Sequence, residues 1–422
     1  ASIQTGKDPS RMGMSYLAGS RGPMGPGHML VPPPVVGNIP PEETTLAEAL
    51  RQAGYTTAHI GKWHLQGHGE RGRENYPDKH GFDVNIAGHN AGQPGSYYFP
   101  YQSPRHAWTN VPDLEEGQKG DYLTDALTDR AIRFIEAQQG KPFYLNMWYY
   151  TVHTPIQPRK DKLAKYRRKA QALGLEKTSG QAVPDHQSWT HARQDNPPYA
   201  ALVESMDENI GRILEALKRL DLANDTIVIF FSDNGGLSTG GGPKMPTSNL
   251  PLRAGKAWLY EGGIRVPLII RYPPAVKGGQ RIDQPVISTD IYPTILDLAG
   301  LPLRPQQHVD GVSLKPLLSG TAATLDRPAI YFHFPHYHHI NTMGPSGAVR
   351  EGDYKLIEVF ETGGVELYNL RDDIGEQQNL AEARPQLAAG LKRMLHDWRA
   401  ASGVQMPTRN PDYQPAQDWR KK

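Results

Sequence analysis

Strand and helix signals alternate along most of the chain, and this alternation constrains the fold more than any other feature. A capping box at Thr45 and Glu48 opens one helical segment, Gly54 closes it, and the apolar residues 55–60 follow. The pattern recurs and is typical of a largely parallel sheet flanked by helices. The predicted strands are 55–60, 142–150, 226–234 and 266–272, and the predicted helices are 46–53, 121–139, 199–220 and 291–299.

From Asp326 the pattern changes to short strands separated by turn residues, which favours an antiparallel sheet. We therefore predict an α/β domain with a central sheet over residues 1–325 and a smaller C-terminal α+β subdomain over 326–422. The polar stretch from Gln157 to Pro198 has no strong strand signal, and is interpreted as a solvated insertion or as a lid over a site. The predicted C-terminal strands are 328–334, 353–360 and 365–370, followed by a helix over 385–401.

Composition limits the classes of function. The 422 residues carry 46 basic and 44 acidic side chains, so no overall field favours nucleic acid or an anionic membrane, and anion recognition must be local. No apolar run approaches the roughly 20 residues that span a bilayer. Cysteine is absent, which excludes disulfides, thiolate metal sites and a cysteine nucleophile within these residues.

Several polar side chains lie just after predicted strands, where ligands bind in open α/β sheets. An aspartate beside an asparagine offers oxygen ligands for Ca²⁺ or Mg²⁺, and lysines with histidines suit an oxyanion. We also expect Lys62 and His64 to share a face, because they are two apart in extended backbone. The candidates are Lys62, His64, His153, Asp233, Asn234 and Lys256.

Each of these residues also has an ordinary structural interpretation. A single lysine or histidine in a turn is usually solvated or hydrogen-bonded, and Asp-Asn-Gly-Gly is commonly only a turn. Glu261 and Arg265 are predicted to pair and hold a turn. The glycine-rich residues 235–243 lack the spacing of a phosphate-binding loop, so we expect a flexible loop there.

Taken together, the segments resemble the formylglycine-dependent sulfatases of the alkaline phosphatase superfamily, and the resemblance covers nearly the whole chain. It implies a mixed central sheet between helices, followed by a smaller domain with an antiparallel sheet. The matching segments are "GYTTAHIGKWHLQG", "HTP", "YAALVESMDENIGRIL", "FFSDNGG", "GKAWLYEGGIRVPLII", "TDIYPTILDLAG", "DGVSLKPLL" and "ELYNLRDDIGEQQNLA".

The resemblance also implies a mechanism. A formylglycine hydrate attacks sulfur while Ca²⁺, or possibly Mg²⁺, held in part by Asp233 and Asn234, neutralises the sulfate. His153 faces the leaving oxygen and Lys256 grips a sulfate oxygen. Lys62 holds the nucleophile and another sulfate oxygen, and His64 takes a proton so that the covalent sulfate is expelled.

In the family, an aspartate pair and a Cys/Ser-x-Pro-Ser/Ala-Arg motif precede a segment similar to "ASIQTGKDPSRMG", with which this sequence begins. The resemblance therefore implies that the nucleophile and two further metal ligands lie on an N-terminal segment before residue 1. That segment would be a separate chain, lie across a break at a modified residue, or be deleted. Family members suggest a periplasmic or extracellular location.

The substrate implied by the resemblance is a sulfated carbohydrate or another sulfate ester. Residues 81–101 and "YFHFPHYHH" resemble segments of bacterial polysaccharide sulfatases, and the candidate sugar contacts are His89, Asn90, Trp148 and His336. The histidine cluster could also be a surface loop or a second metal site. Two other functions stay open: a phosphodiesterase or phosphonate monoester hydrolase of the same superfamily, and a non-catalytic protein that binds sulfated glycans.

Overall fold

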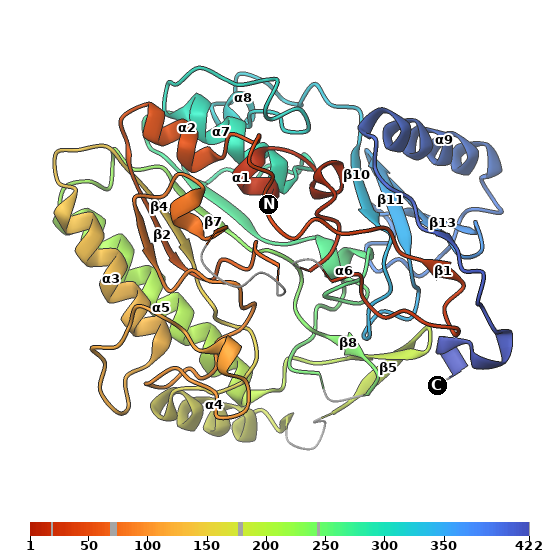
Figure 1. Cartoon of the computed structure of the whole chain (residues 1–422), viewed down its shortest axis with the longest axis horizontal. Coiled ribbons are helices and arrows are strands. Elements are labelled where there is room, and N and C mark those ends of the chain that lie inside the picture. Colours follow the sequence, from red (N-terminus) through yellow and green to blue (C-terminus); the bar gives the residue numbers. More distant parts are fainter. Residues whose placement is uncertain (18–19, 68–73, 176–179, 243–244, 422) are drawn as a thin grey trace.

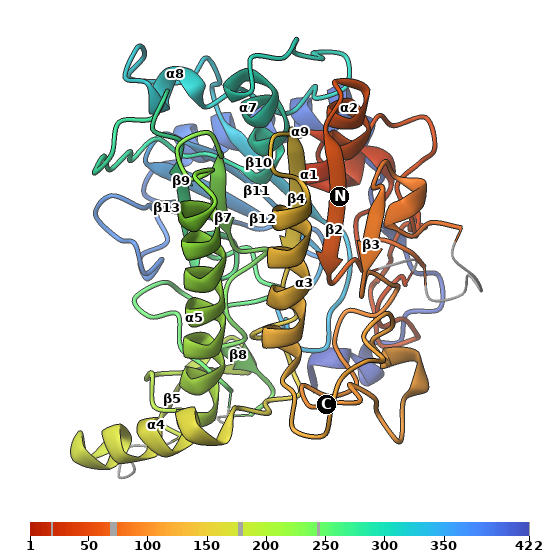
Figure 2. The same cartoon turned by 90° about the vertical axis from the view of Figure 1, so that its left-hand side faces the viewer.

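The strands of the α/β part end just before most of the polar side chains singled out above. The computed structural model describes residues 1–17, 20–67, 74–175, 180–242 and 245–421. Within these ranges β2 (Thr56–Gly61) lies parallel between β3 (Val84–Ile86) and β4 (Phe143–Trp148). Strand β7 (Val228–Phe231) pairs antiparallel with β9 (Leu268–Arg271), and lies next to β4 in Figures 1 and 2. The predicted α/β fold is confirmed.

The predicted capping box determines where β2 begins. Helix α2 (Leu46–Gln52) starts where the Thr45 hydroxyl accepts the N–H of Glu48 at 3.1 Å, and the Glu48 carboxylate accepts that of Thr45 at 2.8 Å. Gly54 then turns the chain with φ +88°. Strand β2 follows with Ala58 and Ile60 fully buried, so its carboxyl end emerges from the core at Lys62.

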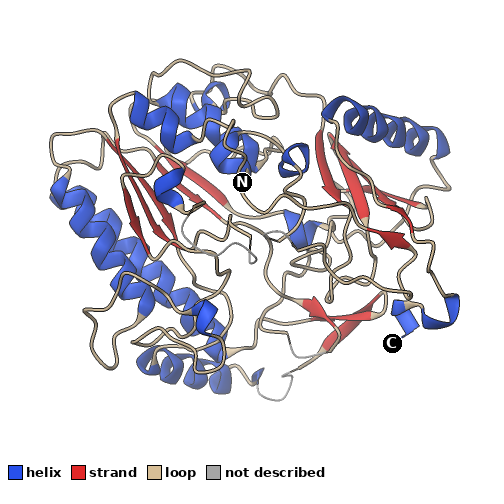
Figure 3. Cartoon of the chain, in the orientation of Figure 1, coloured by secondary structure: helices blue, strands red, loops and turns tan. Residues whose placement is uncertain are grey.

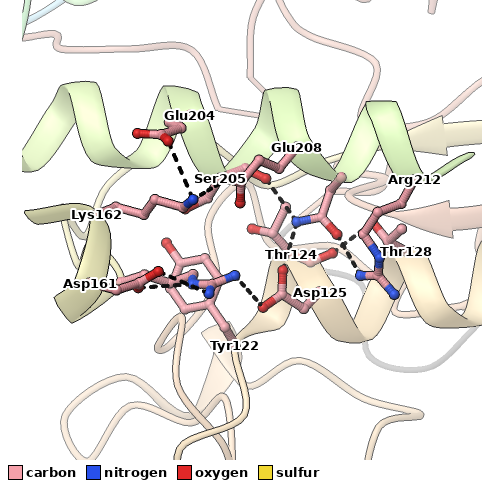
Figure 4. A network of polar contacts seen from close by, with 12 residues as sticks. Tyr122, Thr124, Asp125, Thr128, Asp161, Lys162, Glu204, Ser205, Glu208 and Arg212 are labelled. Atoms are coloured by element: carbon pink, nitrogen blue, oxygen red, sulfur yellow. Dashed lines mark hydrogen bonds and ion pairs between the residues drawn. The ribbon is translucent and has the colours of Figure 1, made fainter. Parts of the chain in front are cut away.

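Helices α3 (Leu123–Ala137) and α5 (Pro197–Arg219) cover one face of these strands (Figure 2). Their apolar residues pack on the strands, and polar side chains join the helices to each other. Asn209 donates to Asp125 at 2.7 Å, which links α5 to α3. Figure 4 shows Lys162 extending from α4 (Lys160–Ala172) toward Glu204 on α5. The Lys162 Nζ lies 3.3 Å from the Glu204 Oε1.

The polar stretch between Gln157 and Pro198 contains more structure than its composition indicated. Besides α4 it contains β5 (Ala182–Asp185) and β6 (Ser188–His191), and β6 pairs with β8 (Thr239–Gly240). Strands β5 and β6 form a local antiparallel hairpin, and β6 also pairs with the distant β8. Both strands are short and carry no apolar alternation, so a hydrophobic pattern could not reveal them. The pairing with β8 also orders part of the predicted glycine-rich loop, whose residue 243 lies outside the described residues.

The C-terminal sheet has the antiparallel order β10–β11–β12–β13 and is covered by α9 (Figures 1 and 3). Strand β11 was not predicted, because small residues open it. At Gly347 an added Cβ would lie 2.4 Å from the Arg399 guanidinium and 3.2 Å from the Phe332 carbonyl, so a larger residue would require Arg399 to move. The bounds are β10 (Ile330–Phe334), β11 (Ser346–Glu351), β12 (Tyr354–Val359), β13 (Val365–Asn369) and α9 (Pro385–Ser402).

The other elements are short or peripheral. No helix among the described residues is long and apolar enough to cross a membrane. These elements are α1 (Ser2–Thr5), β1 (Leu30–Val31), α6 (Glu261–Ile264), α7 (Ile291–Leu298), α8 (Lys315–Leu318), β14 (Thr408–Arg409) and the 3₁₀ turns Pro9–Met12, Pro77–Lys79, Ala107–Thr109, Ser288–Asp290, Pro415–Gln417 and Trp419–Lys421.

A buried ion cluster joins the C-terminal sheet to α6, which Figure 1 shows between that sheet and the parallel strands. Lys355 of β12 is completely buried, and its Nζ lies 3.0 Å from Glu261 of α6 and 2.9 Å from Glu376. Burial raises the pKa of Glu376, and Lys355 only partly offsets this. The predicted pair of Glu261 and Arg265 is present at 3.5 Å.

Apolar side chains reinforce the same junction. Trp258 and Tyr260 pack in one buried cluster with Ala348, Ile357 and Tyr368 of the C-terminal sheet. Packing is thus continuous across the domain boundary predicted at residue 325, and the boundary itself stays a prediction.

Replacing Lys355 by methionine should destabilise the fold by about 3–5 kcal/mol, because two buried carboxylates lose their common cation. Urea denaturation measures this change in the free energy of unfolding. Arg281→Met is the control, since the Arg281–Asp283 pair is 86% and 78% exposed, and it should change stability by less than about 0.5 kcal/mol. The double variant Lys355→Met/Glu376→Gln should recover part of the loss. Equal stability of Lys355→Met and the parent would contradict the role of this lysine.

Candidate active site

The carboxyl end of β2 positions Lys62 and His64. Gly61 has φ +105°, and an added Cβ there would lie 2.0 Å from the Trp148 carbonyl, so glycine permits the close approach of β2 and β4. The N–H of Lys62 donates to that carbonyl at 2.8 Å, and the N–H of His64 donates to the carbonyl of His89 at 3.0 Å.

The expectation that Lys62 and His64 share a face in extended backbone is wrong. His64 has φ +55°, so the chain has left the extended conformation and entered the left-handed region. At Gly92 an added Cβ would lie 2.5 Å from the His64 ring, which shows that the loop after His89 packs against that ring. A turn, and not strand periodicity, therefore orients His64.

Lys256 and His153 are in direct contact, although they come from distant segments. The Lys256 Nζ lies 3.1 Å from the His153 Nε2. A lysine ammonium can only donate, so Nε2 is the acceptor. The His153 Nδ1 lies 3.2 Å from the Thr154 carbonyl and therefore carries the ring proton. The backbone N–H of Lys256 donates to Gly236 at 3.1 Å, which ties this contact to the loop after β7.

The charges of this group favour an added anion. Burial lowers the pKa of Lys62, Asp233 raises it and Lys256 lowers it. Burial also lowers the pKa of Lys256, against the opposing effect of Asp233. Burial, Lys256 and Lys62 lower the pKa of His153 to about 4. Two lysines thus face one aspartate, and an oxyanion would supply the missing negative charge.

Asp233 and Asn234 follow β7 and offer oxygen atoms to a cation. The Asp233 Oδ1 accepts the N–H of Asn234 at 3.0 Å, and among the described residues Oδ2 has no hydrogen-bond or ion-pair partner. The Asn234 amide nitrogen donates to Gly235 at 2.9 Å, which leaves the amide oxygen for a ligand. Both are hard donors that suit Ca²⁺ or Mg²⁺. The described part of the chain contains no group of three or more histidine, cysteine, aspartate or glutamate side chains that could hold a metal, so these two donors make only a partial shell.

The predicted sugar contacts differ in their surroundings. His89 is buried beside the His64 turn, and burial, opposed by a hydrogen bond with Asn90, lowers its pKa to about 4. Trp148 is stacked 5.8 Å from Trp63 in a hydrophobic cluster. His336 is completely buried, with its ring nitrogens 2.9 Å from the Ser15 hydroxyl and 3.2 Å from the Arg21 carbonyl. His89 therefore lies beside the turn of His64, whereas Trp148 and His336 are packed among other side chains. The roles of all four residues as sugar contacts stay predictions.

The histidine cluster is not a surface loop. His333, His336 and His338 are buried, and only His339 is exposed. His333 bonds the Gln405 carbonyl at 3.0 Å, so the side chains of the cluster have separate partners. His338 was not among the predicted sugar contacts. Burial, His339 and Lys256 lower its pKa to about 4. Alternating histidines gave no signal for which of them lies near the lysine.

The fold is a mixed α/β fold with lysine, histidine, aspartate and asparagine side chains at its strand ends. A model of the sulfatase family matches residues 1–301, and a model described as N-sulphoglucosamine sulphohydrolase, C-terminal, matches residues 254–401. The chain belongs to the sulfatase family. Because this is a family of sulfuric ester hydrolases, the predicted enzyme class is confirmed at that level.

Curated relatives agree with this assignment. A sulfatase of Formosa agariphila is 32% identical over 412 residues, which cover 84% of this chain and 69% of the relative. Human N-acetylgalactosamine-6-sulfatase is 30% identical over 351 residues, which cover 79% of this chain and 58% of the relative. The chain thus spans about three fifths to two thirds of these relatives.

Solved structures share the fold. Ps i-CgsB in complex with k-i-k-neocarrahexaose has a TM-score of 0.69 at 24% identity, covering 98% of this chain and 82% of that one. A protein solved in complex with its substrate D-glucosamine-2-N,6-O-disulfate has a TM-score of 0.66 at 23% identity, covering 98% of this chain and 88% of that one. At these identities the likeness concerns the fold alone.

Lys256→Met should raise the pKa of His153 from about 4 toward, but not to, the ordinary histidine value of 6.5. Burial still acts on the ring, whereas the repulsion by Lys256 is removed. Titration of labelled histidines by NMR measures this change in chelator-treated protein. His89 is the internal control, because its pKa is lowered by burial without Lys256 and should stay at about 4. An unchanged pKa of His153 would contradict the contact.

Proposed function

We propose that this chain hydrolyses sulfate esters of a sulfated carbohydrate. The contact between Lys256 and His153, with Lys62 and Asp233 acting on the same group, is the observation that carries the proposal. This contact supports the proposal because it joins a cationic donor to a neutral imidazole, and preorganised donors of this kind stabilise an oxyanion during its transfer. The names of the relatives support the sulfated sugar, since two of the proteins compared above act on or bind sulfated hexosamines by their printed descriptions.

The proposed roles follow from the contacts. Lys62 and Lys256 hold sulfate oxygens, because their lowered pKa values show charges that burial disfavours and an anion would stabilise. The ammonium of Lys256 donates to the His153 Nε2 and so orients the ring beside the proposed sulfate position. We assign to His153 the proton or hydrogen bond that the leaving oxygen takes up. His64 lies on the turn against Gly92 and acts as the base that releases sulfate.

Asp233 and Asn234 would hold a divalent cation, Ca²⁺ or Mg²⁺. When bound, the cation neutralises charge on the sulfate oxygens, and a formylglycine supplies the nucleophilic oxygen. In the family the formylglycine motif precedes a segment similar to "ASIQTGKDPSRMG", so we assign the nucleophile to a residue outside these 422 residues. We also propose a periplasmic or extracellular location, on the basis of the family.

A substrate panel tests the reaction class. Release of inorganic sulfate from sulfated monosaccharides and from 4-nitrophenyl sulfate is measured beside phosphate release from phosphate monoesters and the hydrolysis of phosphodiesters and phosphonate monoesters. Faster turnover of the sulfate esters supports the proposal. Faster turnover of a phosphodiester would favour the phosphodiesterase, and tight binding of sulfated sugars without turnover would favour a non-catalytic protein.

Lys256→Ala should lower sulfate ester turnover by about 10²–10³, by analogy with the loss of one preorganised donor to an oxyanion. The fold should be retained, as measured by circular dichroism. Lys277→Ala is the matched control, because Lys277 is an exposed lysine at a distance from the strand ends, and its turnover should equal that of the parent. Lys256→Arg should recover little, since a planar guanidinium does not aim a compact charge at one oxygen. Turnover of Lys256→Ala within threefold of the parent would refute the role.

Asp233→Ala should abolish binding of Ca²⁺, because it removes the charged oxygen ligand. Saturating Ca²⁺ at 100 times its dissociation constant should stabilise the parent by about 2.7 kcal/mol and leave the variant unchanged. Calorimetry and thermal denaturation, with and without the metal, provide a readout that is independent of turnover. Asp283→Ala is the control, because Asp283 is an exposed carboxylate. Stoichiometric zinc in the purified protein, or equal Ca²⁺ stabilisation of both proteins, would contradict the assignment.

A further inference from the structure

The turn from His338 to Asn341 is fixed to the residues that follow Lys256. The Trp258 Nε1–H donates to the Ile340 carbonyl at 3.0 Å, and the Asn341 amide donates to the Ala257 carbonyl at 2.8 Å. Trp258 is 1% exposed and Asn341 is completely buried, so these hydrogen bonds are protected from water. The turn and the lysine therefore have a fixed relative position.

The hydrogen bonds of the turn also determine the tautomer of His338. The backbone N–H of Ile340 donates to the His338 Nδ1 at 3.3 Å, so Nδ1 is an acceptor. Burial, His339 and Lys256 lower the pKa of His338 to about 4, and the ring is neutral near pH 7. A neutral imidazole with an accepting Nδ1 carries its proton on Nε2.

The Nε2–H group of His338 is a donor without an acceptor. Among the described residues it has no hydrogen-bond partner, and the residue is only 7% exposed. The Nε2 atom is not one of the fully buried unpaired atoms of the described chain, so a ligand can reach it. The ring plane is held by His339, whose ring centroid lies 4.4 Å away, and by the edge of Tyr16 at 5.9 Å. A nearly buried donor with a fixed direction is the kind of group that recognises a ligand.

We infer that the Nε2–H of His338 donates a hydrogen bond to a sugar hydroxyl next to the sulfate ester that Lys256 holds. A neutral donor suits a hydroxyl oxygen, whereas the adjacent lysine suits the charged sulfate. The C-terminal sheet thereby contributes specificity for the sugar to a site whose proposed sulfate contacts come from the α/β domain. This inference rests on the proposed function and assigns to His338 the sugar contact that sequence analysis gave to His336.

His338→Asn tests the donor while keeping the turn, because the asparagine side-chain oxygen can replace the accepting Nδ1 without reaching the position of Nε2. Turnover is compared on 4-nitrophenyl sulfate, which has no sugar, and on the sulfated monosaccharide that the parent hydrolyses fastest. We expect kcat/KM to fall about tenfold on the sugar sulfate, mainly through KM, and to stay within about twofold on the aryl sulfate. His338→Gln, whose amide can reach the position of Nε2, should recover part of the loss.

His396→Ala is the control, because it removes a half-exposed histidine of α9, outside this turn, and should leave both substrates unaffected. Equal losses of His338→Asn on both substrates, or no loss on either, would overturn the inference while leaving sulfatase activity intact. A parent that hydrolyses no sulfate ester would refute the proposed function instead. In that case calorimetric binding of glucosamine 6-sulfate decides, since weaker binding by His338→Asn supports the contact, and equal or absent binding by both proteins rejects it.

Discussion

The buried ammonium of Lys355 is the interaction on which the arrangement of the site depends most. It joins β12 to Glu261 at the start of α6 and to Glu376 after β13. Burial would raise the pKa of Glu261, but Lys355, with Arg350 and Arg265, outweighs burial and keeps this pKa below its ordinary value. Ions inside a protein tolerate little displacement, because each unpaired charge is costly there. The segment from Lys256 to Arg265 is thereby held against the C-terminal sheet.

The site contains unfavourable electrostatic interactions, and the rigid packing around it holds its residues in place despite them. Burial lowers the pKa of both Lys62 and Lys256, and the neighbouring His153 remains neutral beside them. Such perturbed groups gather at functional sites, because a ligand of opposite charge relieves them. His64, with φ +55°, adds a backbone conformation that few residues adopt. The same features that prepare these residues for an anion therefore lower the stability of the fold without the anion.

Local signals in the sequence predicted the elements that form by local interactions. The capping box of Thr45 and Glu48 located the start of α2, and apolar periodicity located α3 and α5. The resemblance to sulfatases identified the family, which the comparisons confirm. Strands β6 and β11 were missed because their residues carry no apolar alternation, although each forms an antiparallel hairpin with a neighbouring strand.

The site was predictable only in outline. Topology indicated that residues after different strands converge, and Lys256 and His153 do meet. Strand periodicity failed at His64, where a left-handed residue ends the extended backbone. It could not separate His336 from His338 either, because the hydrogen bonds from Trp258 and Asn341, rather than spacing, set which ring lies near Lys256.

The position of Lys355 late in the chain has a consequence for synthesis. A ribosome releases the chain from its N-terminus, at about 5–20 residues per second, and early domains begin to fold as they emerge. The parallel strands and Lys256 emerge before β12 does, so Glu261 then lacks the cation that holds it in the finished protein. Until β12 is made, the segment that contains Lys256 lacks the ion cluster that holds it against the C-terminal sheet in the finished protein.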